Sequence, residues 1–192
     1  MAMTTEFGAT DLWVFGYGSL IWRPGFAFEE SAQARLYGYH RSLCVFSHVH
    51  RGTPERPGLV LGLDRGGVCR GLAFRVAAAQ AQETVGYLRA REQATAVYLE
   101  RHVPLRLEDG RKVRGLVYVA DRKHLQYAGK LPPAQLLKLV REGRGQSGEN
   151  PDYVLQTHES LRKMGIYDPV LACLAQELAP GLGAPHPPLA GG

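Results

Sequence analysis

Hydrophobic positions over the first two thirds of the chain are spaced as in β-strands. The apolar run at residues 12–17 is continuous and ends in glycines, which predicts a short strand buried on both faces. Residues 95–107 alternate between apolar and polar positions, as in a strand with one solvent-facing side. The other predicted strands are 34–46, a hairpin of 59–63 and 68–76 around a turn at 64–67, and 112–120 after a turn at 108–111. About six strands result, most of them antiparallel neighbours.

Helical spacing appears at 79–92 and dominates the last part of the chain. The three later helices each start at a proline: one runs from Pro132 and Pro133 through Val140, one follows Asn150 as N-cap, and one follows Asp168 as N-cap through 170–178. Residues 143–150 between them are predicted to form a mobile loop, because they are polar and rich in glycine. Strands followed by helices predict an α+β fold built on one curved sheet or a small barrel.

The chain length sets the domain organisation. A length of 192 residues with 45% apolar residues fits a single domain. We assign this domain to residues 12–179. Residues 1–11 are predicted to be a flexible extension, and the proline- and glycine-rich residues 180–192 a disordered tail.

Charge and cysteine content narrow the classes of function. The formal net charge is +5, but the basic residues are scattered, for example over 70–75 and 111–114, whereas a nucleic-acid-binding protein gathers them on one face. The three cysteines, Cys44, Cys69 and Cys173, form no C-x-x-C pair. This spacing argues against a zinc site or a disulfide framework and fits a reducing compartment. The start of the chain lacks a secretion signal, and no apolar run approaches the ~20 residues of a membrane span, so we expect a cytoplasmic protein.

Glycine is in excess, and two glycines stand where chemistry could occur. The chain has 23 glycines, about 12% of its residues, against about 7% in an average protein. Gly16 and Gly18 lie in the segment G-Y-G-S-L directly after the first predicted strand. The segment lacks the third glycine and the following helix of a dinucleotide-binding fingerprint, and it lacks the G-K-[ST] of a P-loop. It fits two alternatives: a tight turn beside a core strand, or a nest of N–H groups for a carboxylate or carbonyl oxygen.

Glu92 is the second candidate for chemistry. On a helical wheel at about 100° per residue, Glu92 falls on the same stripe as Ala81, Val85 and Leu88. A carboxylate on an apolar face should have a raised pKa, which suits a general base. Arg91 points about 100° away on the wheel and is not an expected partner, and the alternative is that the helix ends early and Glu92 reaches water. Glu83 lies opposite the stripe, as a solvated residue would.

The remaining candidates have simpler explanations. His48 and His50 lie one residue apart in a loop without a partner carboxylate in register, which makes a poor metal site. His158 and Glu159 lack the second histidine of a zinc-protease motif. Ser19 is outside a G-x-S-x-G segment, so it is not an expected hydrolase nucleophile, and Cys44 fits a core position. No metal is therefore expected.

Three segments resemble the ChaC-type γ-glutamylcyclotransferases, which act specifically on glutathione. They are W-V-F-G-Y-G-S-L-I-W at 13–22, H-R-G-T-P-E-R-P-G at 50–58, and L-R-A-R-E at 88–92. The first is highly specific, and so is its combination with the second, and the likeness extends from about Trp13 to Leu178. The resemblance implies a small mixed, mostly antiparallel β-barrel flanked by helices. It also implies a cofactor-free lyase that converts glutathione to 5-oxoproline and cysteinylglycine.

The resemblance also assigns residues. It implies that Glu92 is the proton acceptor, and Glu83 has the spacing of an additional acid that some family members carry. The implied substrate-binding residues are Val14, Phe15, Gly16, Tyr17, Gly18, Ser19 and Leu20. Further candidate contacts are Tyr98, Tyr118 and Tyr153, each of which also suits a core position. The alternatives are a cyclotransferase for other γ-glutamyl peptides or γ-glutamylamines and, more distantly, a nucleic-acid-binding module. No residue is assigned to the cysteinylglycine half, and the oligomeric state stays open.

Overall fold

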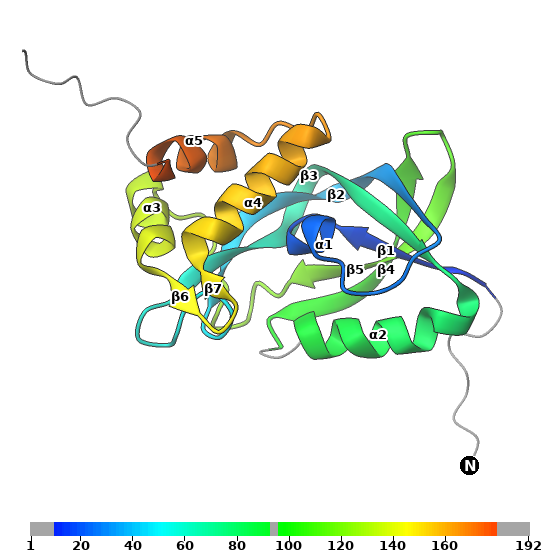
Figure 1. Cartoon of the computed structure of the whole chain (residues 1–192), viewed down its shortest axis with the longest axis horizontal. Coiled ribbons are helices and arrows are strands. Elements are labelled where there is room, and N and C mark those ends of the chain that lie inside the picture. The colour runs from blue at the N-terminus through cyan, green and yellow to red at the C-terminus, as the bar shows by residue number, and fades with distance from the viewer. Residues whose placement is uncertain (1–9, 93–95, 180–192) are drawn as a thin grey trace, which may run out of the picture.

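The computed structural model describes residues 10–92 and 96–179. We expected residues 1–11 to form a flexible extension and residues 180–192 a disordered tail. These two segments lie almost wholly outside the described residues. Within them the fold is α+β, as predicted, with a mixed and mostly antiparallel barrel flanked by helices (Figure 1). None of the described helices is long and apolar enough to cross a membrane.

Five strands close the barrel in the order β1-β3-β2-β4-β5. Their bounds are β1 Leu12–Gly16, β2 Glu30–Ser47, β3 Gly58–Val76, β4 Tyr98–Leu107 and β5 Lys112–Ala120. Four neighbouring pairs are antiparallel, and β1 closes the barrel against β5 in parallel through Trp13 and Val14. Because β1 is paired on both edges, its residues are fixed from two sides.

The predicted hairpin around residues 64–67 is wrong. One continuous strand, β3, runs through this segment and pairs along its length with the equally long β2. Gly66 and Gly67 do adopt the positive φ that a hairpin turn would need, but they form an irregularity at which the pairing shifts between Tyr37 and Tyr39. A bulge uses the same glycine conformations as a tight turn while the strand continues.

The buried strand β1 separates two parts of the core, as its continuous apolar run predicts. Leu12 and Val14 pack toward helix α2 (Ala78–Glu92), together with Val85 and Leu88. The alternate residues Trp13, Phe15 and Tyr17 belong to the larger cluster that fills the barrel and extends to the later helices. Both faces of the strand are therefore covered by apolar side chains.

The helices lie on two sides of the barrel. Helix α2 runs alone along one side, while α3 (Pro133–Glu142), α4 (Asn150–Lys163) and α5 (Pro169–Leu178) gather on the other (Figure 1). Asp168 caps α5 by accepting from the N–H groups of Val170 and Leu171, as predicted. The one-turn helix α1 (Ser19–Trp22), which follows the glycine segment, was not predicted; Trp22 donates to Thr157 of α4 at 3.1 Å.

Two predictions between α3 and α4 are also corrected. Residues 143–150 contain a small hairpin, β6 (Arg144–Gly145) and β7 (Gly148–Glu149), rather than a loop without structure. Asn150 is the first residue of α4 and not its N-cap. Its fully buried amide instead accepts from the Leu59 N–H at 2.7 Å and donates to the Leu59 carbonyl at 2.8 Å, which joins α4 to β3.

Candidate active site

A cavity of about 320 Å³ opens at one end of the barrel. Its volume lies at the lower limit of the usual range for small-molecule sites, about 300–1,000 Å³. It is lined by the end of β1 with α1, by the end of β2 with the loop that follows, by β3, and by the end of α2. The lining is completed by Val97, Tyr98 of β4, Tyr118 of β5, Gln126, Ser147 and Tyr153. Segments far apart in the chain thus meet in one concave site.

Most of the residues assigned from the first motif lie in this cavity. Those that line it are Phe15, Tyr17, Gly18, Ser19 and Leu20, together with the candidate contacts Tyr98, Tyr118 and Tyr153. Val14 is instead fully buried in the core toward α2. Gly16 faces packed neighbours, because a Cβ there would lie 3.1 Å from Leu20 Cβ and 3.2 Å from a Phe74 ring atom. Glu83 is exposed and does not line the cavity, in agreement with the wheel.

Glu92 stands at the end of the stripe and reaches the cavity. Ala81, Val85 and Leu88 on the same face of α2 are buried, and the Glu92 side chain is 17% exposed. Burial raises the pKa of the Glu92 carboxyl above its ordinary value, and the neighbouring Arg91 guanidinium acts in the opposite direction. The helix continues to Glu92, so the alternative of early fraying is not supported.

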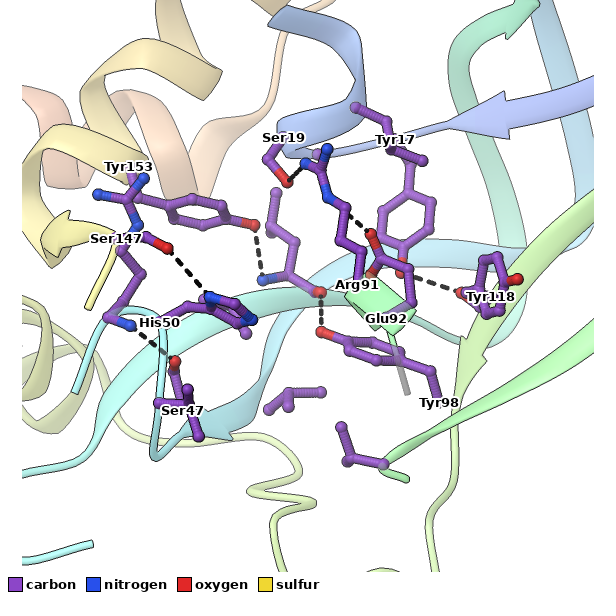
Figure 2. A pocket seen from close by; sticks show the side chains of 18 of the residues that line it. Tyr17, Ser19, Ser47, His50, Arg91, Glu92, Tyr98, Tyr118, Ser147 and Tyr153 are labelled. Atoms are coloured by element: carbon purple, nitrogen blue, oxygen red, sulfur yellow. Dashed lines mark hydrogen bonds and ion pairs between the residues drawn. The ribbon is translucent and has the colours of Figure 1, made fainter. Parts of the chain in front are cut away.

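Arg91 is a partner of Glu92, contrary to the wheel. Arg91 Nε lies 3.2 Å from Glu92 Oε1. Its other nitrogens donate to Ser19 Oγ at 2.9 Å, to the Arg23 carbonyl at 2.6 Å and to the Tyr87 hydroxyl at 2.9 Å. The wheel gives the direction of Cβ only, and a long arginine side chain can turn back along the helix end. Arg91 thereby joins the carboxylate to α1, as Figure 2 shows.

Four tyrosines surround the carboxylate, and three of them donate their hydroxyl protons to protein acceptors. Tyr17 donates to the Tyr118 carbonyl at 2.9 Å, Tyr98 to the Leu61 carbonyl at 2.8 Å, and Tyr118 to Glu100. Tyr153 differs, because its hydroxyl oxygen accepts the Leu61 N–H at 3.0 Å (Figure 2). Within the described residues its own proton has no acceptor, so this hydroxyl can donate to a molecule in the cavity.

The start of α1 places hydrogen-bond donors beside this hydroxyl. The first N–H groups of a helix have no partner within the helix, and Ser19 and Leu20, the first two residues of α1, both line the cavity. A Cβ on Gly18 would lie 3.2 Å from the Tyr153 hydroxyl oxygen. A ligand oxygen at this wall can therefore meet both main-chain N–H groups and the Tyr153 hydroxyl, and glycine keeps the approach open.

At the opposite side of Tyr153 the cavity is lined by Arg51, which the sequence pattern did not single out, and by His50, which it suggested only as a poor metal ligand. Arg51 is 7% exposed, and its guanidinium carbon lies 5.6 Å from the centre of the Tyr153 ring. His50 Nδ1 lies 3.0 Å from Ser147 Oγ. Both residues belong to the H-R-G-T-P-E-R-P-G segment, so that motif was the available signal.

The metal-site expectation can be compared with the geometry. Across residues 10–92 and 96–179, no group of three or more histidine, cysteine or acidic side chains could hold a metal ion. His48 stacks on Phe46, and Glu159 pairs with Arg162 on the surface of α4. Cys44 is fully buried, and burial raises the pKa of its thiol to about 12, which fits a core residue rather than a nucleophile.

Comparison with known proteins identifies the relatives of this chain. A family model described as ChaC-like protein matches residues 12–179. The chain belongs to the ChaC-like family. It is 34% identical over 157 residues to the glutathione-specific γ-glutamylcyclotransferase of Escherichia coli, covering 82% of this chain and 68% of that protein. It is 33% identical over 158 residues to human glutathione-specific γ-glutamylcyclotransferase 1, covering 80% of this chain and 71% of that protein.

Solved structures confirm the ChaC-like fold. The crystal structure of a γ-glutamylcyclotransferase specific to glutathione from yeast matches with a TM-score of 0.81 at 23% identity. The match covers 88% of this chain and 96% of the yeast chain. The mixed barrel with flanking helices is thus the fold that the resemblance implied.

Proposed function

We propose that this ChaC-like protein is a lyase that cleaves glutathione into 5-oxoproline and cysteinylglycine, with Glu92 as the general base. The observation that carries the proposal is the position of Glu92. It is a carboxylate held at the cavity wall beside the N–H groups of α1, with a pKa that burial raises. The names of the relatives supply the substrate, glutathione.

The reaction begins with the α-ammonium group of the γ-glutamyl half. Glu92 takes one proton from it, and the resulting amine attacks the γ-carbonyl carbon of the same residue. The C–N bond that forms closes a five-membered lactam. The attack is intramolecular, so the enzyme has mainly to fold the γ-glutamyl chain into reactive geometry, which can lower a barrier by about 7–11 kcal/mol.

The tetrahedral intermediate carries its negative charge on the former γ-carbonyl oxygen. In this proposal that oxygen meets the N–H groups of Ser19 and Leu20 and the hydroxyl of Tyr153. When the intermediate collapses, the bond to the cysteine nitrogen breaks. Glu92 delivers the proton it already holds to that departing nitrogen. The ionised Glu92 then takes the second proton from the nitrogen that has attacked and passes it to the free amine of cysteinylglycine.

We propose further that the protein needs no cofactor and acts in the cytoplasm. Every bond in the reaction is made or broken by acyl transfer without a change in oxidation state, and Glu92 can carry each proton. Cys44, Cys69 and Cys173 are all free thiols, which fits a reducing compartment. Glutathione is the proposed partner, and neither a membrane nor a nucleic acid has a role.

The direct test is product identification. Purified protein is incubated with glutathione, and 5-oxoproline and cysteinylglycine are measured by mass spectrometry. We expect both products in equal amounts. Free glutamate in place of 5-oxoproline would instead indicate simple hydrolysis and overturn the cyclisation. The ratio of kcat/KM for glutathione to that for γ-glutamylalanine separates a glutathione enzyme from a general γ-glutamyl peptide enzyme.

A further inference from the structure

Arg51 is a buried cation that forms no ion pair among the described residues, although the charge of Asp152 acts on it from a distance. It is 7% exposed, yet no carboxylate of the described residues lies within 4.0 Å of its guanidinium. Buried charges in proteins are almost always paired, because leaving water is costly for an ion. The described chain supplies only one side-chain contact with oxygen, from Arg51 Nη1 to the Glu149 carbonyl at 2.9 Å.

The position of Arg51 is nevertheless fixed. Its N–H donates to Ser47 Oγ at 2.9 Å, and the side chain is held between the Glu149 carbonyl and the face of the Tyr153 ring. Nε and Nη2 are left without an acceptor. No fully buried side-chain nitrogen of the described residues lacks a partner, so these two atoms are not sealed, and Arg51 is one of the residues that line the cavity. A residue of the cavity wall therefore has two N–H donors left for a ligand.

The surroundings reinforce a preference for an anion. Arg23 lines the same cavity, and its guanidinium has no partner among residues 10–92 and 96–179. With Arg91, the lining holds three arginines against the single carboxylate Glu92. Burial, and then the three nearby arginines, lower the pKa of His50, so that ring is neutral at pH 7 and acts as a hydrogen-bonding group.

The two ends of the cavity differ in what they can bind. Figure 2 shows Ser47, His50, Ser147 and Tyr153 on one side and Glu92 with Arg91 on the other. Contacts with Ser47 and Tyr153 place Arg51 on the first side. The α-carboxylate of the γ-glutamyl half shares its carbon with the amine that Glu92 must reach, so that carboxylate belongs to the Glu92 end.

We propose that Arg51 binds the C-terminal carboxylate of the leaving dipeptide, and thereby makes the enzyme select γ-glutamyl peptides with a free carboxyl end over γ-glutamylamines and C-terminally blocked peptides. This assignment rests on the proposed function and adds the recognition of the cysteinylglycine half. A guanidinium with two free donors matches the two oxygens of a carboxylate, and such charge-assisted pairs are among the stronger hydrogen bonds in proteins.

The test compares glutathione with its glycinamide, which differs only in the C-terminal group. For the wild-type protein we expect kcat/KM to be at least about tenfold higher for glutathione, from the energy of such a pair. Arg51→Gln should lower kcat/KM for glutathione by a similar factor, mostly through KM, and leave the glycinamide unchanged. Arg51→Lys keeps the charge and should retain part of the preference. Arg56→Gln removes a charge from the same loop outside the cavity and should change neither value.

The possible outcomes separate this proposal from a structural role for Arg51. An equal loss with both substrates would mean that Arg51 positions the cavity wall or binds the α-carboxylate, and would overturn the assignment. A wild-type enzyme that does not distinguish the two substrates would do the same. Thermal unfolding of both Arg51 variants shows whether they fold. If Arg51→Gln does not fold, the two substrates are compared with Arg51→Lys instead.

A binding measurement keeps the two proposals distinguishable. Calorimetry with cysteinylglycine and with its amide reports on the Arg51 end without any turnover. Weaker binding of the amide to the wild type, with the difference lost in Arg51→Gln, supports the subsite even if no 5-oxoproline forms. Equal binding of acid and amide, alongside normal production of 5-oxoproline, would contradict the subsite and leave the proposed function intact.

Discussion

The Glu92 carboxylate experiences two opposing influences, and its use as a base depends on their balance. Burial favours the protonated form, while Arg91 at 3.2 Å favours the ionised form. An ionised carboxylate with a raised pKa is a stronger base than one in water. We therefore expect Arg91 to act as a positioning residue that opposes the effect of burial on the proposed base.

Replacing Arg91 should shift the pH dependence of the rate. The Arg91 guanidinium lowers the pKa of Glu92, whereas burial raises it. Arg91→Gln removes the lowering effect and should therefore raise that pKa further. The acid limb of kcat/KM for glutathione then moves to higher pH, and the rate at pH 6 falls more than the rate at pH 8. Arg91→Lys keeps the charge and should leave the limb nearer that of the wild type. An unchanged limb in Arg91→Gln would show that the ion pair does not tune the base.

Glu92→Gln should also change stability with pH. The pKa of Glu92 is raised in the folded protein, so the folded state holds its proton more tightly than the unfolded state. The wild type therefore loses stability as pH rises from the unfolded pKa through the folded one, and the glutamine variant does not. Denaturant unfolding should show Glu92→Gln gaining stability over the wild type between pH 4 and pH 8. A constant difference across this range would contradict a raised pKa.

Tyr153 and Tyr98 form a matched pair, because both bond to the main chain of Leu61. Tyr153→Phe leaves the Leu61 N–H unpaired, and Tyr98→Phe leaves the Leu61 carbonyl unpaired, so each should cost about 1–3 kcal/mol of stability. Only Tyr153 also offers a proton to the cavity. We expect kcat to fall about tenfold or more in Tyr153→Phe, as for loss of an oxyanion donor, and to change little in Tyr98→Phe. Equal kcat values in the two variants would remove Tyr153 from the mechanism.

At the scale of elements, glycines hold the loop after β2 against the start of β3 and the β6–β7 hairpin. A Cβ on Gly58 would collide with the Arg51 carbonyl, and one on Gly143 would lie 2.7 Å from the same oxygen. These contacts are main chain against main chain, so the neighbours cannot turn away. Part of the excess of glycine is thus explained by close approach around Arg51, as well as by Gly18 at the cavity wall.

Gly58→Ala tests this close approach. The added methyl group meets main-chain atoms, and overpacking of this kind costs about 1–3 kcal/mol or more. Gly86→Ala is the control: it lies on the exposed side of α2 with nothing within 4 Å, and should stabilise the protein by about 0.5–1 kcal/mol. Urea unfolding measures both. A Gly58→Ala protein as stable as the wild type would show that the loops can separate.

Element boundaries illustrate what local patterns can and cannot predict. The apolar run of β1, the stripe on α2 and the Asp168 cap each depend on neighbouring residues, and each was predicted correctly. Gly66 and Gly67 have the positive φ of a turn, but the partner strand β2 decides that the chain continues. The amide of Asn150 likewise forms its hydrogen bonds with Leu59, which is 91 residues away. Such a distant partner cannot be predicted from the local sequence.

At the scale of the whole molecule, barrel closure brings the site together. The parallel contact of β1 with β5 is only two residue pairs long, yet it completes the ring whose end holds the cavity. Glu92, Tyr153 and the first turn of α1 meet there, although up to 134 residues separate them along the chain. Periodicity identified Glu92 by itself, whereas the placement of Arg51 and Arg91 required the fold.

The proposed mechanism depends most on Glu92 as the proton acceptor, and one measurement tests this role directly. The rate of 5-oxoproline formation from glutathione is compared between the wild type and Glu92→Gln, which keeps the size and shape of the side chain. We predict a loss in kcat of about 10²–10⁴-fold, the usual contribution of a general base, with thermal unfolding still cooperative. A folded Glu92→Gln protein that forms 5-oxoproline within about threefold of the wild-type rate would contradict the role of Glu92 as general base.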